Sequence, residues 1–334
     1  MKNSLISMAK SFQGLEMATS YTHIPVMCQE IMDILAPALS ADHPVMVDAT
    51  LGLGGHSSVA LARFPSLRVI GIDRDPQALE IASKNLHEYS ARVDLHLATF
   101  DQISEVLQGE TVDAVLFDLG LSSLQIDSPD RGFSYAQDAP LAMRMDGDTG
   151  ELSAADVVNT YPGDQLESLL RHNGDEKYAR RITQAILLER EKQPFTSSAR
   201  LVETITSAMP AMNTRHGHPA KRTFQAIRME VNQERPSLES ALPQALDSVK
   251  PHGFIAVLSY HSGEDRLVKK AFNHACMDQV PHKLPLVPKE HRAQFVAVTR
   301  GALKPTEQET KDNRRAGSAR LRVIKRIEVS DERS

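Results

Sequence analysis

The sequence predicts an α/β fold in which a long helical insertion interrupts an open, mostly parallel sheet. Between residues 45 and 75, an apolar run, a glycine-rich turn, a helix start and a second apolar run that ends in an acid follow in order. This order is typical of a βαβ unit that binds a nucleotide. Apolar runs of strand length return at residues 93–97, 112–117 and 254–258, whereas roughly ninety residues from position 129 onward show only helical patterns.

The first βαβ unit indicates where a ligand binds. Residues 45–47 form a short apolar strand, and the glycines of residues 52–55 allow a tight turn that brings the backbone close to a ligand. A second strand, residues 67–72, ends at Asp73, where an acid can accept both hydroxyl groups of an adenosine ribose. By itself, a glycine-rich turn also fits a loop that binds no ligand. Ser57 replaces the third glycine of the dinucleotide pattern, which disfavours NAD.

The next elements continue the alternation of helix and strand. Residues 22–39 carry an apolar helical face that we expect to cover the first strand. Pro76 opens another helix, and residues 93–97 alternate like a third strand that ends near Phe100. Phe100 keeps two interpretations of equal weight, as a core side chain or as the lining of an adenine site.

The fourth strand, residues 112–117, runs into a polar loop from Asp118 to Gln125. Ligands of open parallel sheets bind outside the carboxyl ends of the strands, so this loop is a candidate site. After the helical stretch, residues 254–258 form a fifth strand, and residues 295–299 and 321–327 are expected to close the sheet as a hairpin.

These elements divide the chain into three parts. Residues 1–20 are expected to be a disordered tail. Residues 21–128 and 221–334 form the sheet domain, and residues 129–220 form an inserted helical domain. We found no internal repeat.

The composition is that of an ordinary soluble protein. Of 334 residues, 41% are hydrophobic and 24% are charged. Two cysteines and the spacing of the histidines predict no disulfide framework and no metal site, and they favour the cytoplasm. No apolar run has the length of a membrane span, and no secretory signal is evident.

The formal net charge of -5 requires that any contact with nucleic acid come from local basic patches. Residues 311–326 hold seven basic residues and one acid, a run that fits either a solvated face or a surface that binds phosphates. A second group, Lys221, Arg222 and Arg228, falls on a predicted helix that fits the same two interpretations.

Several of these motifs together resemble one family, the bacterial 16S ribosomal RNA cytosine-N4 methyltransferases of the RsmH (MraW) type. The matching stretches are His23–Val26, Asp48–Ser57, Gly71–Asp75, Asp118–Asp127, Asp130–Phe133, Met143–Asp146, His218–Asn232, Ser259–Arg266 and Asn313–Arg322. The chain departs from the commonest family pattern at Ala49, Leu53, Leu124, Tyr260 and Gly263. The usual residue is proline at position 124, phenylalanine at 260 and leucine at 263.

The resemblance implies a class I, Rossmann-like methyltransferase sheet that uses S-adenosylmethionine, with a helical insertion that recognises the substrate. The implied substrate is N4 of one cytidine, cytidine 1402 at the P site of the decoding centre, in 16S rRNA within the small ribosomal subunit. The implied cofactor contacts are Gly54, Gly55, His56, Asp73, Phe100, Asp118 and Gln125. The implied or proposed RNA contacts are Lys221, Arg222, Arg228, Tyr260, His261, Arg314, Arg315 and Arg320.

The chemistry of the reaction suits these residues. The exocyclic amine of cytosine is a weak nucleophile, so the protein must orient it and accept charge as it loses a proton. Asp118 or a loop carbonyl is the candidate acceptor, and Tyr260 or Phe133 the candidate for stacking on an unstacked cytidine. Neither Cys28 nor Cys276 follows a strand, which argues against C5 chemistry.

Three alternatives stay open at this point. The first alternative is a noncatalytic RNA-binding assembly factor, and the second is an N4-cytosine methyltransferase of another nucleic acid. The third and least favoured is an NAD-dependent dehydrogenase. The oligomeric state is open as well, with a homodimer as one option.

Overall fold

The computed structural model describes residues 25–147, 152–210, 218–278, 288 and 291–328. The predicted N-terminal tail therefore lies outside the described residues, as do His23 and Ile24 of the first family motif. No helix among the described residues is both long and apolar enough to cross a membrane.

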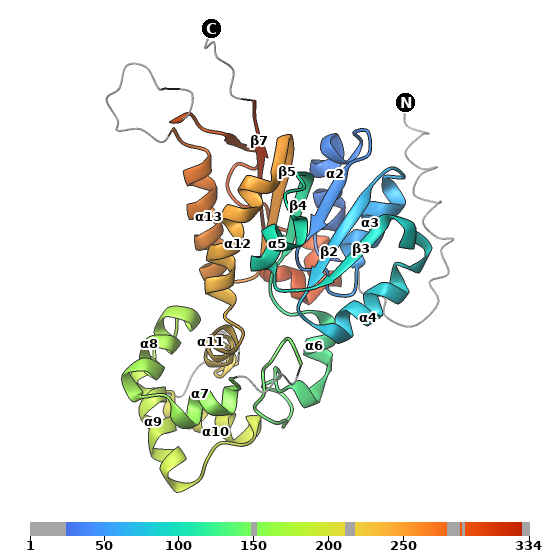
Figure 1. Ribbon diagram of the computed structural model, residues 1–334. Coiled ribbons are helices and arrows are strands. Elements are labelled where there is room, and N and C mark those ends of the chain that lie inside the picture. The colour runs from blue at the N-terminus through green and yellow to red at the C-terminus, as the bar shows by residue number, and fades with distance from the viewer. Residues whose placement is uncertain (1–24, 148–151, 211–217, 279–287, 289–290, 329–334) are drawn as a thin grey trace.

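A seven-stranded sheet forms the centre of the larger lobe (Figure 1). Its strands are β1 (Val45–Asp48), β2 (Arg68–Asp73), β3 (Val93–Leu97), β4 (Val112–Asp118), β5 (Val249–Ser259), β6 (Phe295–Ala297) and β7 (Arg320–Arg326). The spatial order is β3-β2-β1-β4-β5-β7-β6. The pairs among β1 to β5 are parallel, and β7 is antiparallel to both β5 and β6. The predicted α/β class I methyltransferase sheet and its closing hairpin are confirmed.

Helices cover both faces of the sheet, as its apolar strands require. One face packs against α2 (Cys28–Leu39), α3 (Gly55–Arg63) and α4 (Pro76–Asn85). The other packs against α5 (Ile103–Leu107), α12 (Glu234–Ser248) and α13 (Ser262–Ala275). Shorter elements are η2 (His87–Arg92), η3 (Phe100–Gln102), α6 (Ser123–Asp127), η4 (Pro129–Arg131), α14 (Glu307–Asp312) and η7 (Arg314–Ser318).

The glycine-rich turn joins β1 to α3. Gly54 has φ +80°, a left-handed conformation that residues with a Cβ rarely adopt, and it occupies the N-cap position of α3. A Cβ at Gly55 would lie 2.7 Å from Cγ of Pro25. Both glycines are therefore required by the backbone, one by its dihedral angle and one by the close approach of a neighbouring loop.

The helical part forms a second lobe with a core of its own (Figure 1). It comprises α7 (Ala154–Thr160), α8 (Gly163–Gly174), α9 (Ala179–Lys192), α10 (Ser198–Ala208) and α11 (Lys221–Val231). The boundary that we predicted between residues 220 and 221 separates α11 from this lobe. Phe224, Ala226 and Ile227 of α11 are buried in the helical core, so the chain returns to the sheet domain only after α11.

Candidate active site

Three acids meet at the carboxyl edge of the sheet. Asp48 ends β1, Asp73 ends β2 and Asp118 ends β4, and these parallel strands are neighbours. The edge faces the helical lobe (Figure 1). The structure therefore brings together the two acids that the sequence singled out, and it adds Asp48.

Asp73 is held by the backbone of the loops around it. Its Oδ2 accepts a hydrogen bond of 2.7 Å from the amide of Gly52, and its Oδ1 accepts one of 2.9 Å from the amide of Asp75. Burial raises the pKa of Asp73 to about 6, although both amide hydrogen bonds act to lower it. The carboxyl group is fixed in place, and its high pKa favours any ligand that donates hydrogen bonds to the carboxylate.

Asp118 lies between two side chains at the end of β4. The hydroxyl group of Tyr260 donates to its Oδ1 at 2.7 Å, while Nδ1 of His56 lies 3.6 Å from its Oδ2. The amide of Asp118 donates to the hydroxyl group of Thr50 at 2.6 Å, which ties β4 to the loop after β1. Burial raises the pKa of Asp118, yet 26% of its side chain remains exposed, so a ligand can reach it.

The side chain of His56 points away from solvent. Only 6% of it is exposed, and its Nε2 lies 3.0 Å from the carbonyl oxygen of Val26. Gly54 offers no side-chain cap to α3, so the first amides of this helix are available to an anionic group. A cofactor contact at Gly54, Gly55 and His56 would therefore use the backbone, because the imidazole of His56 lies beside Asp118.

The remaining predicted cofactor residues have structural partners as well. Gln125 is buried, and its amide nitrogen lies 3.4 Å from Oδ2 of Asp75. Phe100 packs edge-on against Phe117, with ring centroids 6.1 Å apart, and it also lines a pocket. Phe100 thus contacts the core and also lines a pocket, and the interpretation as the lining of an adenine site stays a prediction.

A pocket lies between the sheet edge and the helical lobe. The sheet domain contributes residues that follow β1, β2, β3 and β4 and residues of α12 and α13, and the helical side contributes two methionines and His172 of α8. The lining residues are Thr50, Arg74, Phe100, Leu119, Gly120, Met145, His172, Met229, Glu234, Arg235, Leu238, Gly263, Glu264 and Leu267. The pocket therefore has walls from both the sheet domain and the helical lobe.

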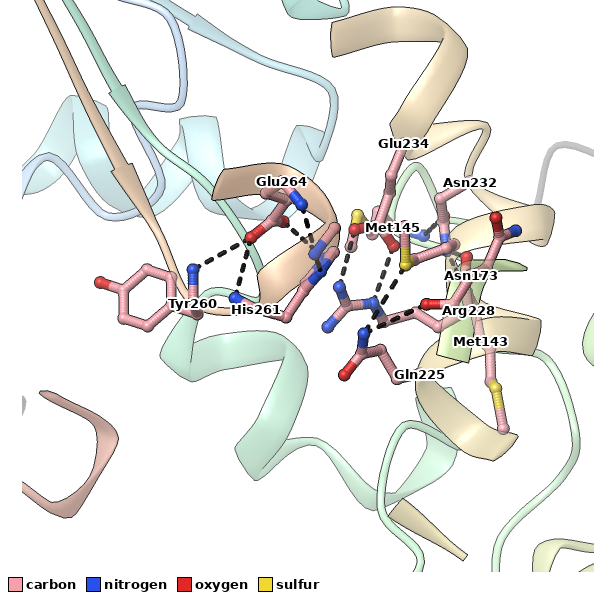
Figure 2. A network of polar contacts seen from close by, with 12 residues as sticks. Met143, Met145, Asn173, Gln225, Arg228, Asn232, Glu234, Tyr260, His261 and Glu264 are labelled. Carbon is pink, nitrogen blue, oxygen red and sulfur yellow. Dashed lines mark hydrogen bonds and ion pairs between the residues drawn. The ribbon is translucent and has the colours of Figure 1, made fainter. Parts of the chain in front are cut away.

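Figure 2 shows the polar network that joins the two lobes beside this pocket. Arg228 of α11 makes two hydrogen bonds of 2.7 Å to Glu234 of α12, with 13% and 11% of the two side chains exposed. Asn232 donates to the carbonyl of Met143 at 2.7 Å and accepts from the amide of Met145 at 2.8 Å. The charge of Arg228 is thus engaged inside the protein, and the predicted RNA contact at Arg228 is not supported.

His261 caps α13 and does not project toward a substrate. Its Nδ1 accepts from the amides of Gly263 and Glu264 at 3.2 and 3.3 Å, and its Nε2 lies 3.1 Å from Oε1 of Glu264. Burial acts to raise the pKa of Glu264, but the hydrogen bond and charge of His261 and the charge of Arg228 hold it below its ordinary value. The predicted RNA contact at His261 is therefore a helix cap, and sequence reasoning missed its partner Glu264.

The other predicted RNA residues lie on separate elements. Lys221 and Arg222 are exposed at the start of α11, where Arg222 donates to the carbonyl of Asp175 at 3.1 Å. Arg320 pairs with Ser259 across β7 and β5, so it lies at the carboxyl edge of β5, and it forms an ion pair of 3.3 Å with Asp265.

Three further predictions concern η7 and the stacking residues. Arg315 is half-buried in η7, and the side chain of Arg314 lies outside the described residues. Phe133, proposed to stack on a cytidine, is buried in the helical core, so that prediction is wrong. Tyr260 remains a candidate, because it is only partly buried.

Comparisons with known proteins agree with this geometry. Residues 20–327 match the MraW methylase family. The chain is 51% identical over 309 residues to ribosomal RNA small subunit methyltransferase H of Streptomyces avermitilis, covering 91% of this chain and 97% of that one. The protein of the same name from Cutibacterium acnes is 51% identical over 310 residues, which cover 91% and 92% of the two chains.

Among solved structures, a putative rRNA-methylase from Clostridium thermocellum aligns with a TM-score of 0.43 and 15% identity, over 91% of this chain and 100% of that one. A TM-score this low carries no argument about this chain. The family match, in contrast, spans nearly the whole sequence. The chain therefore belongs to the MraW methylase family.

Proposed function

We propose that this protein transfers a methyl group from S-adenosylmethionine to N4 of a single cytidine, cytidine 1402 of the decoding centre, in 16S ribosomal RNA. The observation that carries the proposal is the position of Asp118. Its partly exposed carboxyl group lies at the end of β4, on the same sheet edge as Asp73 and the open N-terminus of α3. A family of methylases and relatives named for the RNA of the small ribosomal subunit support the same function. Such a substrate places the protein in the cytoplasm.

The residues at the sheet edge suit S-adenosylmethionine. The fixed carboxyl group of Asp73 can accept the two ribose hydroxyl groups, and the uncapped amides of α3 can bind the carboxylate of the methionine part. Phe100 offers an aromatic face to the adenine. When bound, the cofactor supplies a methyl group on a positively charged sulfur, which takes the electron pair of the broken bond.

Asp118 is the group of this chain that can act on the cytosine amine. The lone pair of the cytosine amine is delocalised into the ring. The amine therefore becomes a good nucleophile only as its proton is drawn away. A carboxylate within hydrogen-bond reach both orients the amine and accepts that proton. The raised pKa of Asp118 brings its proton affinity closer to that required of a base near neutral pH.

The RNA meets the protein on the side of the pocket that the helical lobe provides. Lys221 and Arg222 lie at the lobe's surface, and Arg320 lies at the sheet edge beside Ser259. These exposed cations can contact phosphates on either side of a cytidine that has left its stack. We therefore retain substrate recognition as the role of the helical lobe.

The test uses isotopically labelled S-adenosylmethionine and small ribosomal subunits that lack the modification. After the reaction, the RNA is digested to nucleosides. We expect label in N4-methylcytidine from one site, and D118N is expected to abolish it. Label in another nucleoside, or none despite bound cofactor, would contradict the proposal and favour another nucleic acid or an assembly factor. If D118N retained normal turnover and normal cofactor binding, Asp118 would not be the acceptor.

A second test addresses the RNA surface. Replacing Arg314, Arg315 and Arg320 by alanine is expected to reduce the salt dependence of RNA binding by a slope of about 2, since each lost phosphate contact removes roughly 0.7 to 0.9. Binding of cofactor is expected to stay the same. R68A is the matched control, because Arg68 is a partly exposed cation, paired with Glu110, that begins β2 at the opposite edge of the sheet. An unchanged slope in the triple variant would exclude this surface.

A further inference from the structure

The two oxygens of the Asp118 carboxyl group have different neighbours. Oδ1 accepts the hydroxyl proton of Tyr260 at 2.7 Å, whereas Oδ2 faces Nδ1 of His56 at 3.6 Å, beyond the length of a hydrogen bond. Tyr260 is held in turn: its amide donates to Glu264 at 3.0 Å, and its ring lies against Gly120, where a Cβ would be 3.4 Å from Cδ2 of the ring. Oδ1 therefore accepts a hydrogen bond, whereas the contact of Oδ2 with His56 is longer than a hydrogen bond.

The partner of the other ring nitrogen fixes the tautomer of His56. The carbonyl oxygen of Val26 can only accept, so at 3.0 Å Nε2 must carry a hydrogen. In the neutral ring Nδ1 then holds a lone pair that points toward Oδ2 of Asp118. Two acceptors face each other there, and one proton between them would convert the contact into a charge-assisted hydrogen bond.

The surroundings of Asp118 favour the gain of that proton. Asp48 from β1 and Glu264 from α13 are the other acids near it. Cys28 of α2 stays a neutral thiol, because burial and the charge of Asp118 raise its pKa to about 12. Burial and Asp118 likewise raise the pKa of Asp48. A proton that arrives at Asp118 therefore reduces the negative charge of a site rich in acids.

We propose that His56 and Tyr260 are positioning residues that act through Asp118, so that the proton released by the substrate amine is shared between Oδ2 of Asp118 and Nδ1 of His56. This inference rests on the proposed function. As the bond from N4 to the methyl carbon forms, the bond from that carbon to the cofactor's sulfur would break and leave its electron pair on the sulfur. N4 gains one positive charge and gives one proton to Oδ2. Tyr260 keeps Oδ1 engaged, so the proton goes to the oxygen that faces His56. Water takes up the proton when the product leaves.

The kinetic test compares H56Q and Y260F under single-turnover conditions with saturating cofactor. Glutamine can still donate to Val26 but offers nothing at Nδ1, and phenylalanine keeps the ring of Tyr260 without its hydroxyl group. We expect H56Q to slow methyl transfer roughly tenfold or more. In Y260F the acid limb of the pH profile is expected to move to higher pH, because the hydroxyl group of Tyr260 donates to Asp118 and lowers its pKa.

The matched control is Y161F, which removes a hydrogen bond of 3.0 Å from a tyrosine to Glu230 within the helical lobe. It should leave the acid limb in place. Unchanged rates and pH profiles in H56Q and Y260F would overturn the proposal, and so would a loss of rate that weaker cofactor binding explains in full.

A measurement on the ligand-free protein separates this proposal from the proposed function. Long-range ¹⁵N–¹H NMR, at a pH where the ring of His56 is neutral, is expected to show its proton on Nε2, and the Nδ1 resonance is expected to move in D118N. A proton on Nδ1 of the neutral ring would overturn the arrangement even if the enzyme methylates cytidine. If the NMR result holds but no N4-methylcytidine forms, the proposed function fails and the proton site stands.

Discussion

The acids of the strand ends, Asp73 and Asp118, and the acids of the joint between the lobes, Asp75, Asp146 and Glu234, have different partners. Asp73 and Asp118 are held by backbone amides, a tyrosine hydroxyl group and an imidazole. At the joint, each acid contacts an arginine. These pairs are Asp75 with Arg131, Asp146 with Arg74, and Glu234 with Arg228. Within the sheet domain, Asp265 of α13 contacts Arg322 of β7 in the same way.

The pKa values follow this difference. Burial raises the pKa of Asp73 and Asp118, whereas in the acid–arginine pair of the sheet domain Arg322 and Arg320 hold the pKa of Asp265 below its ordinary value although burial opposes them. An acid that is already paired with an arginine has little to gain from a ligand. Burial disfavours the charged form of an acid such as Asp73 or Asp118, and only nearby dipoles stabilise it. Any hydrogen-bond donor or proton that binds to such an acid therefore stabilises it further. The strand ends are therefore built for binding and the joint for stability.

The largest expected effect is at the joint. R131M leaves Asp75 charged, fully buried and without its arginine, and should lower the free energy of unfolding by about 3 to 5 kcal/mol. Urea denaturation measures this loss. The matched control is the double variant D75L/R131M, which buries no charge and should lose less than R131M alone. Equal losses in the two would show that packing, and not the unpaired charge, determines the effect.

The second prediction concerns Asp73. A folded pKa of about 6 against an ordinary value of 3.8 means that the folded protein binds the proton more tightly. The contribution of Asp73 to the free energy of unfolding is therefore greatest below its pKa in the unfolded protein. It falls by about 3 kcal/mol as the pH rises through its pKa in the folded protein. D73N lacks this titration. The difference in unfolding free energy, wild type minus D73N, should decrease over that window, and a constant difference would contradict the raised pKa. D73N should also bind cofactor weakly at every pH.

The features that could be predicted from the sequence are those that neighbouring residues determine. A strand, two glycines and a helix start lie within a short stretch, and Asp73 ends the strand that follows, so the arrangement of the candidate ribose site could be predicted from the sequence. Alternation of strand and helix also implied the parallel sheet. The hydrogen bond from Tyr260 to Asp118 joins residues 142 positions apart, and only the pairing of β4 with β5 brings them together.

The errors have physical reasons of the same kind. The periodicity of α11 showed an amphipathic helix but not which core it packs against, so the lobe boundary was placed before it. Arg228 looked like a surface cation because its partner Glu234 follows a turn in which Gln233 has φ +50°. His261 and Glu264 have the spacing of a capping box, which the sequence could have revealed had histidine been considered as a cap.

The smallest expected effect is at an exposed ion pair of the helical lobe. Arg171 and Glu167 form an ion pair one turn apart on α8, with 52% and 30% of the side chains exposed. Water already solvates both charges, so R171A should lower the free energy of unfolding by only about 0.3 to 0.5 kcal/mol. Urea denaturation in low and high salt measures it, and salt should remove most of the effect. A loss as large as that of R131M would mean that burial does not separate structural ion pairs from incidental ones in this protein. The distinction between joint and strand ends would then rest on cofactor binding alone.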